Sequence, residues 1–190
     1  MIANELESAL VSHGALQNGH FRLSSGRHSD RFIQKFRVLE RPALLEPLAQ
    51  ELARRVAPYA PNVVVSAAVG GIVLGYEVAR HLGTRAIFIE KEEGVPALRR
   101  SFTLDAGDRA FVVEDVVTTG KSVREVLDVV RASGAEAVAV GVLVRRAVVD
   151  FGVPAIALLD MPVESFAPEE CPQCAAGIAL TEPGSRFLAR

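Results

Sequence analysis

FVVEDVVTTGKSV, residues 111–123, combines a strand, an acidic pair and a turn that leads into a helix. Its apolar start is typical of a buried parallel strand, and Glu114 and Asp115 follow directly. The turn at 118–122 is rich in hydroxyl groups, and the spacing of four later residues predicts one buried helix face: Val123, Val126, Leu127 and Val130. A phosphate could bind at the N-terminus of this helix, where backbone N–H groups and the helix dipole favour an anion. Because the carboxylates could accept hydrogen bonds from sugar hydroxyls, the stretch predicts a sugar-phosphate site.

Length and composition favour one compact domain. The chain has 190 residues, of which 49% are hydrophobic, and a formal net charge of −2. This balance argues against a general nucleic-acid or membrane-surface binder, which usually carries a basic excess. No run is long enough to span a bilayer, and the N-terminal residues do not resemble a secretory signal. With only two cysteines, a disulfide scaffold is excluded, and we expect a cytoplasmic protein.

Strands and helices are expected to alternate along the chain. Periodicity predicts helices at 2–10, 41–56 and 72–82, a hairpin-like segment at 19–35, and buried strands at 62–65, 85–89, 111–113, 137–144 and 155–159. Within these helices, Pro47 is expected in a first turn, and one apolar stripe is expected at Ile72, Tyr76, Ala79 and Leu82. Residues 90–109 lose all periodicity, which indicates a lid or binding loop that has room for a short strand at 101–104.

This alternation predicts an α/β fold with a mostly parallel central sheet flanked by helices. Ligands in such sheets bind at the carboxyl ends of the strands. That edge would bring together three segments of the chain: SAAVGG at 66–71, the irregular loop at 90–109, and EDVVTTGKS at 114–122. The fold and the motif therefore predict a binding site at the same place.

These segments resemble a known family. EDVVTTGKS resembles the signature of the type I phosphoribosyltransferases, which bind 5-phosphoribosyl 1-diphosphate (PRPP). GHFRLSSGRHSDRF, residues 19–32, resembles the N-terminal hood of orotate phosphoribosyltransferases, and SAAVGGIVLG, residues 66–75, resembles their diphosphate-binding loop. The similarity extends over residues 14–152. It implies the type I phosphoribosyltransferase fold in a single domain, 1–190, with a small hood mainly at 14–40, a core at about 41–160 and a C-terminal extension at 161–190.

The resemblance also implies roles for individual residues. Glu114 and Asp115 would hold the ribose hydroxyls, residues 118–122 the 5-phosphate and residues 68–71 the diphosphate. The implied substrate-binding set is Ser24, Phe32, Ala68, Val69, Gly70, Gly71, Glu114, Asp115, Val116, Val117, Thr118, Thr119, Gly120, Lys121, Ser122 and Arg146. The implied catalytic set is Lys91, Arg99, Arg100 and Asp115. Mg²⁺ would be carried mainly by PRPP, without direct protein ligands.

The implied reaction joins orotate to PRPP, giving orotidine 5-phosphate and diphosphate for de novo pyrimidine biosynthesis. A ring nitrogen of orotate is the nucleophile, so no side-chain nucleophile is needed. The resemblance also implies a homodimer. From the charge balance, neither a nucleic acid nor a membrane is expected as a partner.

Three departures from the family pattern leave alternatives open. Members usually have Lys or Arg at the position of Ser24 and often an acidic residue at that of Arg145. The loop also lacks the further Lys and the His-Gly that bacterial members commonly carry, and Arg99 and Arg100 are the obvious substitutes. One alternative is transfer to another nucleobase, such as a purine. The other is a non-catalytic PRPP-sensing regulator, against which the short N-terminal portion and the absence of a basic excess both count.

The motif CPQC at 171–174 could be half of a zinc site or a redox pair. A structural zinc ion takes four ligands, and no histidine lies near the motif in sequence. None of the four histidines has metal-ligand spacing: His13, His20, His28 and His81. We therefore expect a reduced structural turn, with pairing of two such motifs across a dimer as the alternative.

Overall fold

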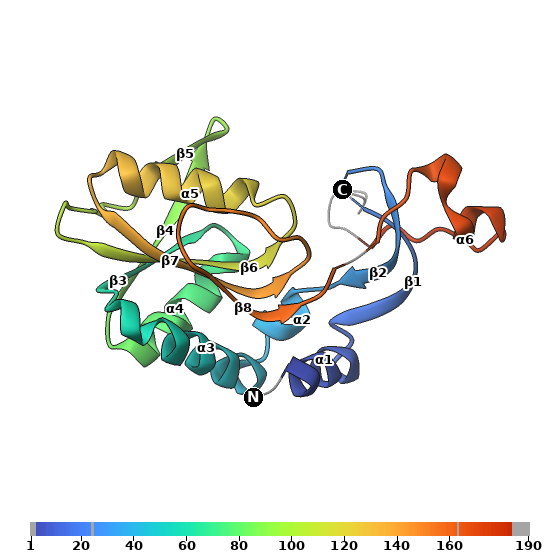
Figure 1. Ribbon diagram of the computed structural model, residues 1–190, viewed down its shortest axis with the longest axis horizontal. Coiled ribbons are helices and arrows are strands. Elements are labelled where there is room, and N and C mark those ends of the chain that lie inside the picture. The colour runs from blue at the N-terminus through green and yellow to red at the C-terminus, as the bar shows by residue number, and fades with distance from the viewer. Residues whose placement is uncertain (1–2, 24, 163, 184–190) are drawn as a thin grey trace.

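A six-stranded sheet forms the centre of the molecule in the computed structural model, which describes residues 3–23, 25–162 and 164–183 (Figure 1). The strand order is β5-β4-β3-β6-β7-β8; β5 runs antiparallel to β4, and the other neighbours are parallel. The bounds are β3 Val63–Ala67, β4 Arg85–Glu92, β5 Val95–Leu98, β6 Arg109–Val117, β7 Glu136–Arg145 and β8 Ala155–Asp160. The predicted mostly parallel sheet is confirmed.

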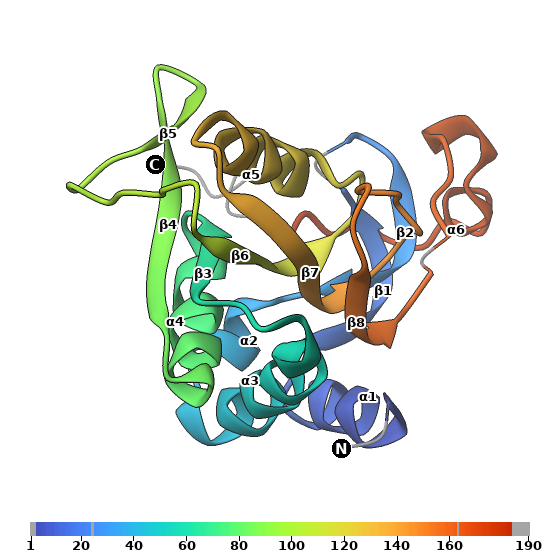
Figure 2. The same cartoon turned by 60° about the vertical axis from the view of Figure 1, so that its left-hand side comes forward.

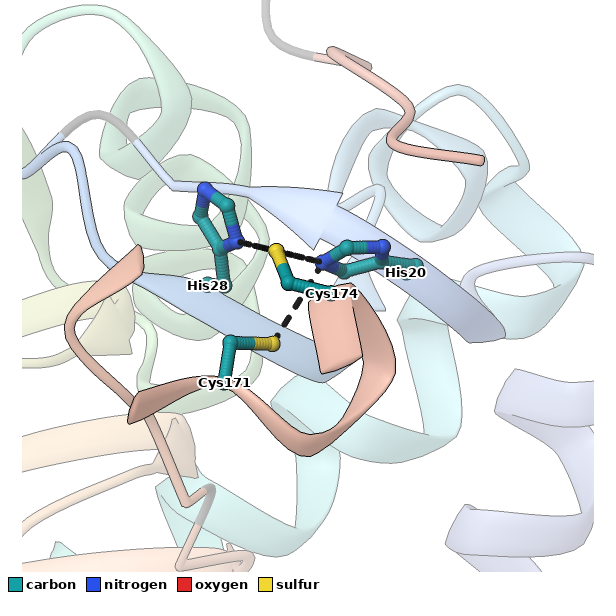
Figure 3. Close-up of side chains that lie close together, drawn as sticks. All are labelled: His20, His28, Cys171 and Cys174. Carbon is teal, nitrogen blue, oxygen red and sulfur yellow. Dashed lines mark hydrogen bonds between the residues drawn. The ribbon is translucent and has the colours of Figure 1, made fainter. Parts of the chain in front are cut away.

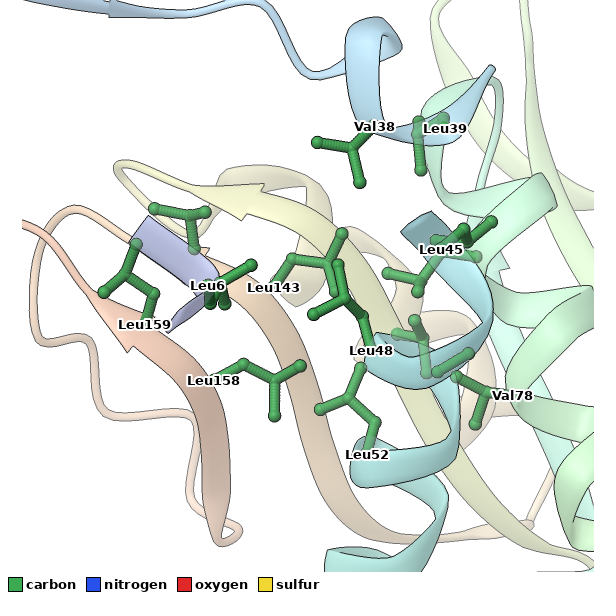
Figure 4. Packing of buried hydrophobic residues seen from close by; sticks show 14 of the residues in the cluster. Leu6, Val38, Leu39, Leu45, Leu48, Leu52, Val78, Leu143, Leu158 and Leu159 are labelled. Atoms are coloured by element: carbon green, nitrogen blue, oxygen red, sulfur yellow. The ribbon is translucent and has the colours of Figure 1, made fainter. Parts of the chain in front are cut away.

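Helices cover both faces of this sheet (Figures 1 and 2). On one face lie α1 Ala3–Ser12, α2 Phe36–Leu39, α3 Pro42–Val56, followed by the short 3-10 helix η1 Ala57–Tyr59, and α4 Gly70–Leu82, and on the other lies α5 Lys121–Ala132. Alternate strand residues face the two cores: Val64 packs with the α3 and α4 side, and Val63 and Val65 pack with the α5 side. Figure 4 shows leucines of α1, α3, β7 and β8 meeting in the first core. The stripe predicted for α5 is buried as expected.

The stripe predicted for α4 is wrong in part. Tyr76 is 67% exposed, and the buried face of the helix instead carries Gly70, Gly71, Leu74, Gly75, Val78 and Ala79. The reason is close packing against β3, because a Cβ atom at Gly71 or Gly75 would lie only 3.1 Å from a side-chain atom of Ser66. Glycines let the helix approach the strand, and Tyr76 is left on the outer side.

Two further local predictions are wrong. Helix α3 begins at Pro42, so Pro47 lies inside it rather than in the first turn. The expected strand at 101–104 is absent, and the strand β5 instead pairs with an extended β4. Glu93 and Gly94 join these strands with φ values of 50° and 86°, as in the two-residue turns that favour glycine. The segment after β4 is therefore partly a hairpin.

A separate two-stranded sheet forms the predicted hairpin at the N-terminal end. Strand β1 Leu16–Arg22 pairs antiparallel with β2 His28–Ile33. The C-terminal segment crosses this hairpin, with isolated bridges from Phe21 to Thr181 and from His28 to Phe166. Between these two bridges lie the 3-10 helix η2 Pro168–Glu170 and the short helix α6 Pro172–Ala175 (Figure 2). No helix of the described residues is long and apolar enough to cross a membrane.

The strand order places the predicted site. The chain proceeds outward from β3 to β4 and then returns to form β6 on the other side of β3. The carboxyl ends of β3 and β6 are therefore neighbours at the point where the direction of winding changes. Crevices at such points are the usual ligand sites of open α/β sheets.

Candidate active site

The acidic pair lies at the end of β6 and is buried. Glu114 is 7% exposed and Asp115 is 1% exposed. Glu114 Oε2 accepts a hydrogen bond of 2.6 Å from the Ser122 hydroxyl, and its Oε1 accepts one of 3.0 Å from the Asp115 N–H. Glu114 is therefore tied to the first turn of α5 and to its neighbour Asp115.

Asp115 also joins β6 to a segment far away in sequence. The Lys35 ammonium lies 3.0 Å from Asp115 Oδ1 and 2.8 Å from Oδ2, and the Val116 N–H donates to Oδ1 at 2.7 Å. The Lys35 side chain is 38% exposed, so its charge can meet both Asp115 and a ligand. The sequence prediction missed Lys35, although a lone lysine two residues after the apolar pair Phe32–Ile33 was an available signal.

The loop after β3 approaches the same carboxylate. A Cβ atom at Gly70 would lie 1.9 Å from Asp115 Oδ2, so only glycine permits this contact. The preceding residue Val69 is 71% exposed, and the peptide bond between Ala68 and Val69 is cis. The structure therefore brings residues 68–71 next to Asp115, as the sequence predicted.

The hydroxyl-rich turn opens towards solvent at the N-terminus of α5. Thr118 and Thr119 are exposed, and Gly120 precedes the helix with a φ of 74°. A Cβ atom at Gly120 would lie 2.9 Å from the side chains of Val149 and Phe151, so both conformation and packing require glycine. The first N–H groups of α5 lack partners within the helix and can bind an anion above Gly120.

Burial and the neighbouring carboxylate change the proton affinity of Glu114. Burial, and then the negative charge of Asp115, raise the pKa of Glu114 from its ordinary value of 4.5 to about 7. Glu114 thus changes charge near neutral pH, at the position where a sugar hydroxyl could donate a hydrogen bond. The arrangement can hold a polyol beside an anion, with a cation from Lys35 within reach.

Comparisons with known proteins agree with this geometry. A model of the phosphoribosyl transferase domain matches residues 38–149, which include both glycine-containing loops and the acidic pair. An orotate phosphoribosyltransferase of Pelotomaculum thermopropionicum is 50% identical over 190 residues, covering 99% of this chain and all of that protein. The chain belongs to the orotate phosphoribosyltransferase family.

Two further relatives support the assignment. The orotate phosphoribosyltransferase of Heliobacterium modesticaldum is 52% identical over 176 residues, covering 90% of this chain and 92% of that protein. The crystal structure of orotate phosphoribosyltransferase from Aeropyrum pernix superposes with a TM-score of 0.70 at 25% identity, covering 82% of this chain and 93% of that one. The type I phosphoribosyltransferase fold is therefore shown by sequence and structure together.

The basic residues assigned to the catalytic loop lie on or just after the β4–β5 hairpin. Lys91 pairs with Glu125 of α5 at 2.8 Å, so it reaches the helix that carries the phosphate turn. Arg99 pairs with Glu92 at 3.4 Å and Arg100 with Glu90 at 2.9 Å, both within the segment that contains β4 and β5. The ion pairs found for these three residues do not include the acidic pair, so their catalytic role stays a prediction.

The residues assigned to base recognition lie on two elements. Phe32 of β2 is half-buried, and its ring centroid is 5.7 Å from that of Phe21. Arg146 follows β7, its N–H donates to the Val117 carbonyl at 2.8 Å, and burial lowers the pKa of its guanidinium. Arg145 instead pairs with Asp160 of β8, at 2.9 Å from its Nη2. Ser24 lies outside the described residues.

The turn predicted at CPQC has two histidines beside it in the structure, although none is near it in sequence. Four side chains converge where the C-terminal segment crosses the hairpin: His20, His28, Cys171 and Cys174 (Figure 3). Sequence spacing could not indicate this, because more than 140 residues separate His28 from Cys171 and only the fold brings them together. This cluster involves neither Glu114 nor Asp115.

Proposed function

We propose that the protein transfers the 5-phosphoribosyl group of PRPP to orotate, releasing diphosphate and forming orotidine 5-phosphate. The observation that carries the proposal is the meeting of Gly70 and the Glu114–Asp115 pair at the switch point of the sheet. The names of relatives about half identical over nearly the full chain select orotate among the possible bases.

The buried acidic pair would hold the ribose. Glu114 and Asp115 offer carboxylate oxygens to the two ribose hydroxyls, and the Ser122 and Lys35 contacts fix their orientation. The 5-phosphate would bind at the turn 118–122, where the free N–H groups of α5 favour an anion. Both ends of the sugar phosphate are then held, which aligns its anomeric carbon with the incoming ring nitrogen.

Displacement of diphosphate builds negative charge on the leaving group and cationic character on the ribose. The loop 68–71 approaches closely and can offer backbone N–H groups to the diphosphate. The ammonium of Lys91 is the proposed cation for the leaving group, because its hairpin borders α5 through Glu125. Ionised Glu114 and Asp115 would stabilise the positive charge that develops on the sugar.

We further propose that Mg²⁺ enters with PRPP and neutralises charge on the diphosphate. The donor set fits an ion that takes few protein ligands. Oxygens of Glu114 and Asp115 would be the nearest carboxylates, yet they already accept hydrogen bonds from Ser122, Lys35 and two backbone N–H groups. Most of the Mg²⁺ ligands would therefore come from substrate oxygens.

A homodimer is part of the proposal and is supported by an apolar surface beside the site. Phe36, Val69, Val73 and Tyr76 are between 46% and 71% exposed. Val73 and Tyr76 also line a groove of about 310 Å³ between α4 and the start of α3. Exposed apolar patches of this kind commonly mark protein interfaces. A cytoplasmic location is also proposed, and the two free cysteines favour it.

The test is a panel of bases offered separately with PRPP and Mg²⁺: orotate, uracil, adenine, guanine and xanthine. Turnover of orotate at a rate far above that of the others is expected. Turnover of another base without turnover of orotate would contradict the proposal and favour the alternative base. Binding of PRPP without turnover of any base would favour a regulator.

A further inference from the structure

The His20–His28–Cys171–Cys174 cluster combines two pairs of side chains from opposite ends of the chain. The histidines lie on β1 and β2 of the hairpin. Cys171 is the N-cap of α6, and Cys174 lies within this short helix. Figure 3 shows all four side chains pointing towards one another. His20, His28 and Cys171 are each at most 5% exposed. One nitrogen or sulfur atom from each residue lies within 4.8 Å of the other three.

Four distances among these atoms match edges of a tetrahedron around one metal ion. Bonds of about 2.05 Å to nitrogen and 2.3 Å to sulfur predict about 3.4 Å between two nitrogens and about 3.6 Å between nitrogen and sulfur. His20 Nε2 is 3.1 Å from His28 Nδ1. The nitrogen-to-sulfur distances are 3.2 Å from His28 Nδ1 to Cys174, 3.5 Å from His20 Nε2 to Cys171 and 3.6 Å from His20 Nε2 to Cys174. The four atoms are thus spaced as ligands of a common centre.

A hydrogen bond on the outer side of His20 prepares it as a ligand. Its Nδ1 lies 2.8 Å from the Ile178 carbonyl oxygen, which can only accept, so Nδ1 carries the proton. Neutral imidazole has one N–H and one lone pair, and the lone pair of His20 is therefore on Nε2, facing the cluster. A backbone carbonyl on the other ring nitrogen is the usual support of a metal-bound histidine.

Hydrogen bonds among the four residues account poorly for this arrangement. The Nε2 lone pair of His20 faces His28 Nδ1 and both sulfur atoms, and it can accept a good hydrogen bond from only one of them. Lone pairs of nitrogen and sulfur left without a donor would face each other among side chains of which three are buried. A bound cation would satisfy all of them at once.

We propose that His20, His28, Cys171 and Cys174 bind one Zn²⁺ ion as a structural site. Two thiolates and two imidazoles in a tetrahedron are a typical zinc ligand set, and the two thiolates balance the charge of the ion. Cys174 is exposed, which gives the ion a route to the site. Because the protein supplies all four ligands, no coordination position is left for water or substrate, and the role of the ion is structural.

The ion would fasten the C-terminal segment to the hairpin. Without it, this attachment depends on contacts such as Gln173 to the Gly19 carbonyl at 3.0 Å, Ser29 to the Glu164 carbonyl at 2.9 Å, and the bridge at Thr181. The hairpin ends shortly before Lys35, which contacts Asp115. Zinc would therefore also steady the segment that supplies this lysine.

The first test is metal content. Protein produced with zinc and purified under reducing conditions should contain about one Zn²⁺ per chain by elemental mass spectrometry. After removal of zinc by a chelator, Co²⁺ should bind and give the visible absorption of tetrahedral cobalt and the near-ultraviolet charge-transfer bands of cobalt bound to thiolate. Protein with neither zinc nor cobalt uptake would overturn the proposal. Iron at the site in place of zinc would overturn the choice of metal.

Variants locate the site. Cys174→Ser and His28→Gln should each lose most of the bound zinc. His13→Gln should keep it, because His13 is exposed directly after α1 and contacts only Ser12 and Ala9 among the hydrogen bonds found for it. Retention of zinc by both cluster variants would overturn the assignment. Should a variant fail to fold, thiol labelling of the natural protein replaces it: both cysteines should react only after chelation. Equal reactivity before and after chelation, in protein kept under reducing conditions, would exclude the site.

Limited proteolysis tests the structural role. Chelated protein should be cut within residues 161–183 while the central domain survives, and added Zn²⁺ should restore resistance. Equal resistance with and without zinc would overturn the fastening role. None of these measurements depends on transferase activity, so their failure is distinguishable from failure of the proposed reaction.

Discussion

Replacing Glu114 by Gln should stabilise the protein at about pH 8 while impairing it as a catalyst. Glu114 is buried beside Asp115, and its pKa in the folded protein is about 7 rather than 4.5. Each tenfold change in proton affinity is about 1.4 kcal/mol, so the ionised side chain costs about 3 kcal/mol of folding free energy. The amide of Gln removes this cost and retains the shape. Its oxygen can accept from the Asp115 N–H, and its nitrogen can donate to the Ser122 hydroxyl.

The sign of the effect with pH follows from proton binding. Between the unfolded pKa of 4.5 and the folded pKa of about 7, the folded state of the natural protein binds more protons than the unfolded state. The contribution of Glu114 to stability is therefore complete at low pH and decreases as pH rises through 7. The gain from Gln should be below about 1 kcal/mol at pH 5 and approach about 3 kcal/mol at pH 8.

Urea unfolding at both pH values measures these differences. Glu169→Gln is the matched control, because Glu169 is exposed in η2 and its replacement should change stability by less than about 0.5 kcal/mol. A Glu114→Gln variant that is no more stable than the natural protein at pH 8 would refute the reasoning. So would a gain of equal size at both pH values, since the titration of Glu114 would then not be its source.

Gly70→Ala should lower turnover on the order of 100-fold, because the new Cβ would lie 1.9 Å from Asp115 Oδ2 and displace the carboxylate. Gly107→Ala should leave turnover unchanged, because a Cβ at Gly107 would have no atom within 4 Å. Equal turnover for the two variants would contradict the proposed contact. Lys35→Met should destabilise by about 2 kcal/mol in thermal unfolding, because it leaves buried Asp115 without its cation. Arg37→Met is the control: it removes an ion pair between exposed side chains and should lower the free energy of unfolding by less than about 0.5 kcal/mol. A similar loss of stability in both variants would argue against the Lys35–Asp115 pair. Lys91→Ala should reduce turnover on the order of 100-fold, because it removes the cation proposed for the leaving group. Stability should change little, because the ion pair of Lys91 with Glu125 is partly exposed. Steady-state rates equal to those of the natural protein would exclude a catalytic role for Lys91.

Local patterns predicted the parts of this fold that depend on burial alone. The α5 stripe is correct because a helix with one apolar face packs that face on the sheet. The same rule failed for α4, where Gly71 and Gly75 face Ser66 and the larger Tyr76 is exposed. The spacing of apolar residues does not show whether a helix packs through its large side chains or through glycines that allow close approach.

In the candidate site, too, some contacts could be predicted from the sequence and others could not. Glu114 and Gly120 belong to one continuous strand–turn–helix unit, and their mutual placement follows from that unit. Lys35 lies 80 residues before Asp115, and its contact depends on how the hairpin docks on the core. The partnership of Cys171 with His20 likewise depends on contacts across 151 residues. Such pairs carry no periodicity, so only the folded chain reveals them.

Formation of orotidine 5-phosphate by the Asp115→Asn variant tests the central claim most directly. With orotate, PRPP and Mg²⁺, the natural protein should form product, and Asp115→Asn should form it at least about 100-fold more slowly. Asp128→Asn is the control, because Asp128 is 74% exposed and pairs with Arg131 on the outer side of α5, and it should retain the natural rate. No product from the natural protein, or a natural rate from Asp115→Asn, would contradict the assignment of this acidic pair to the ribose.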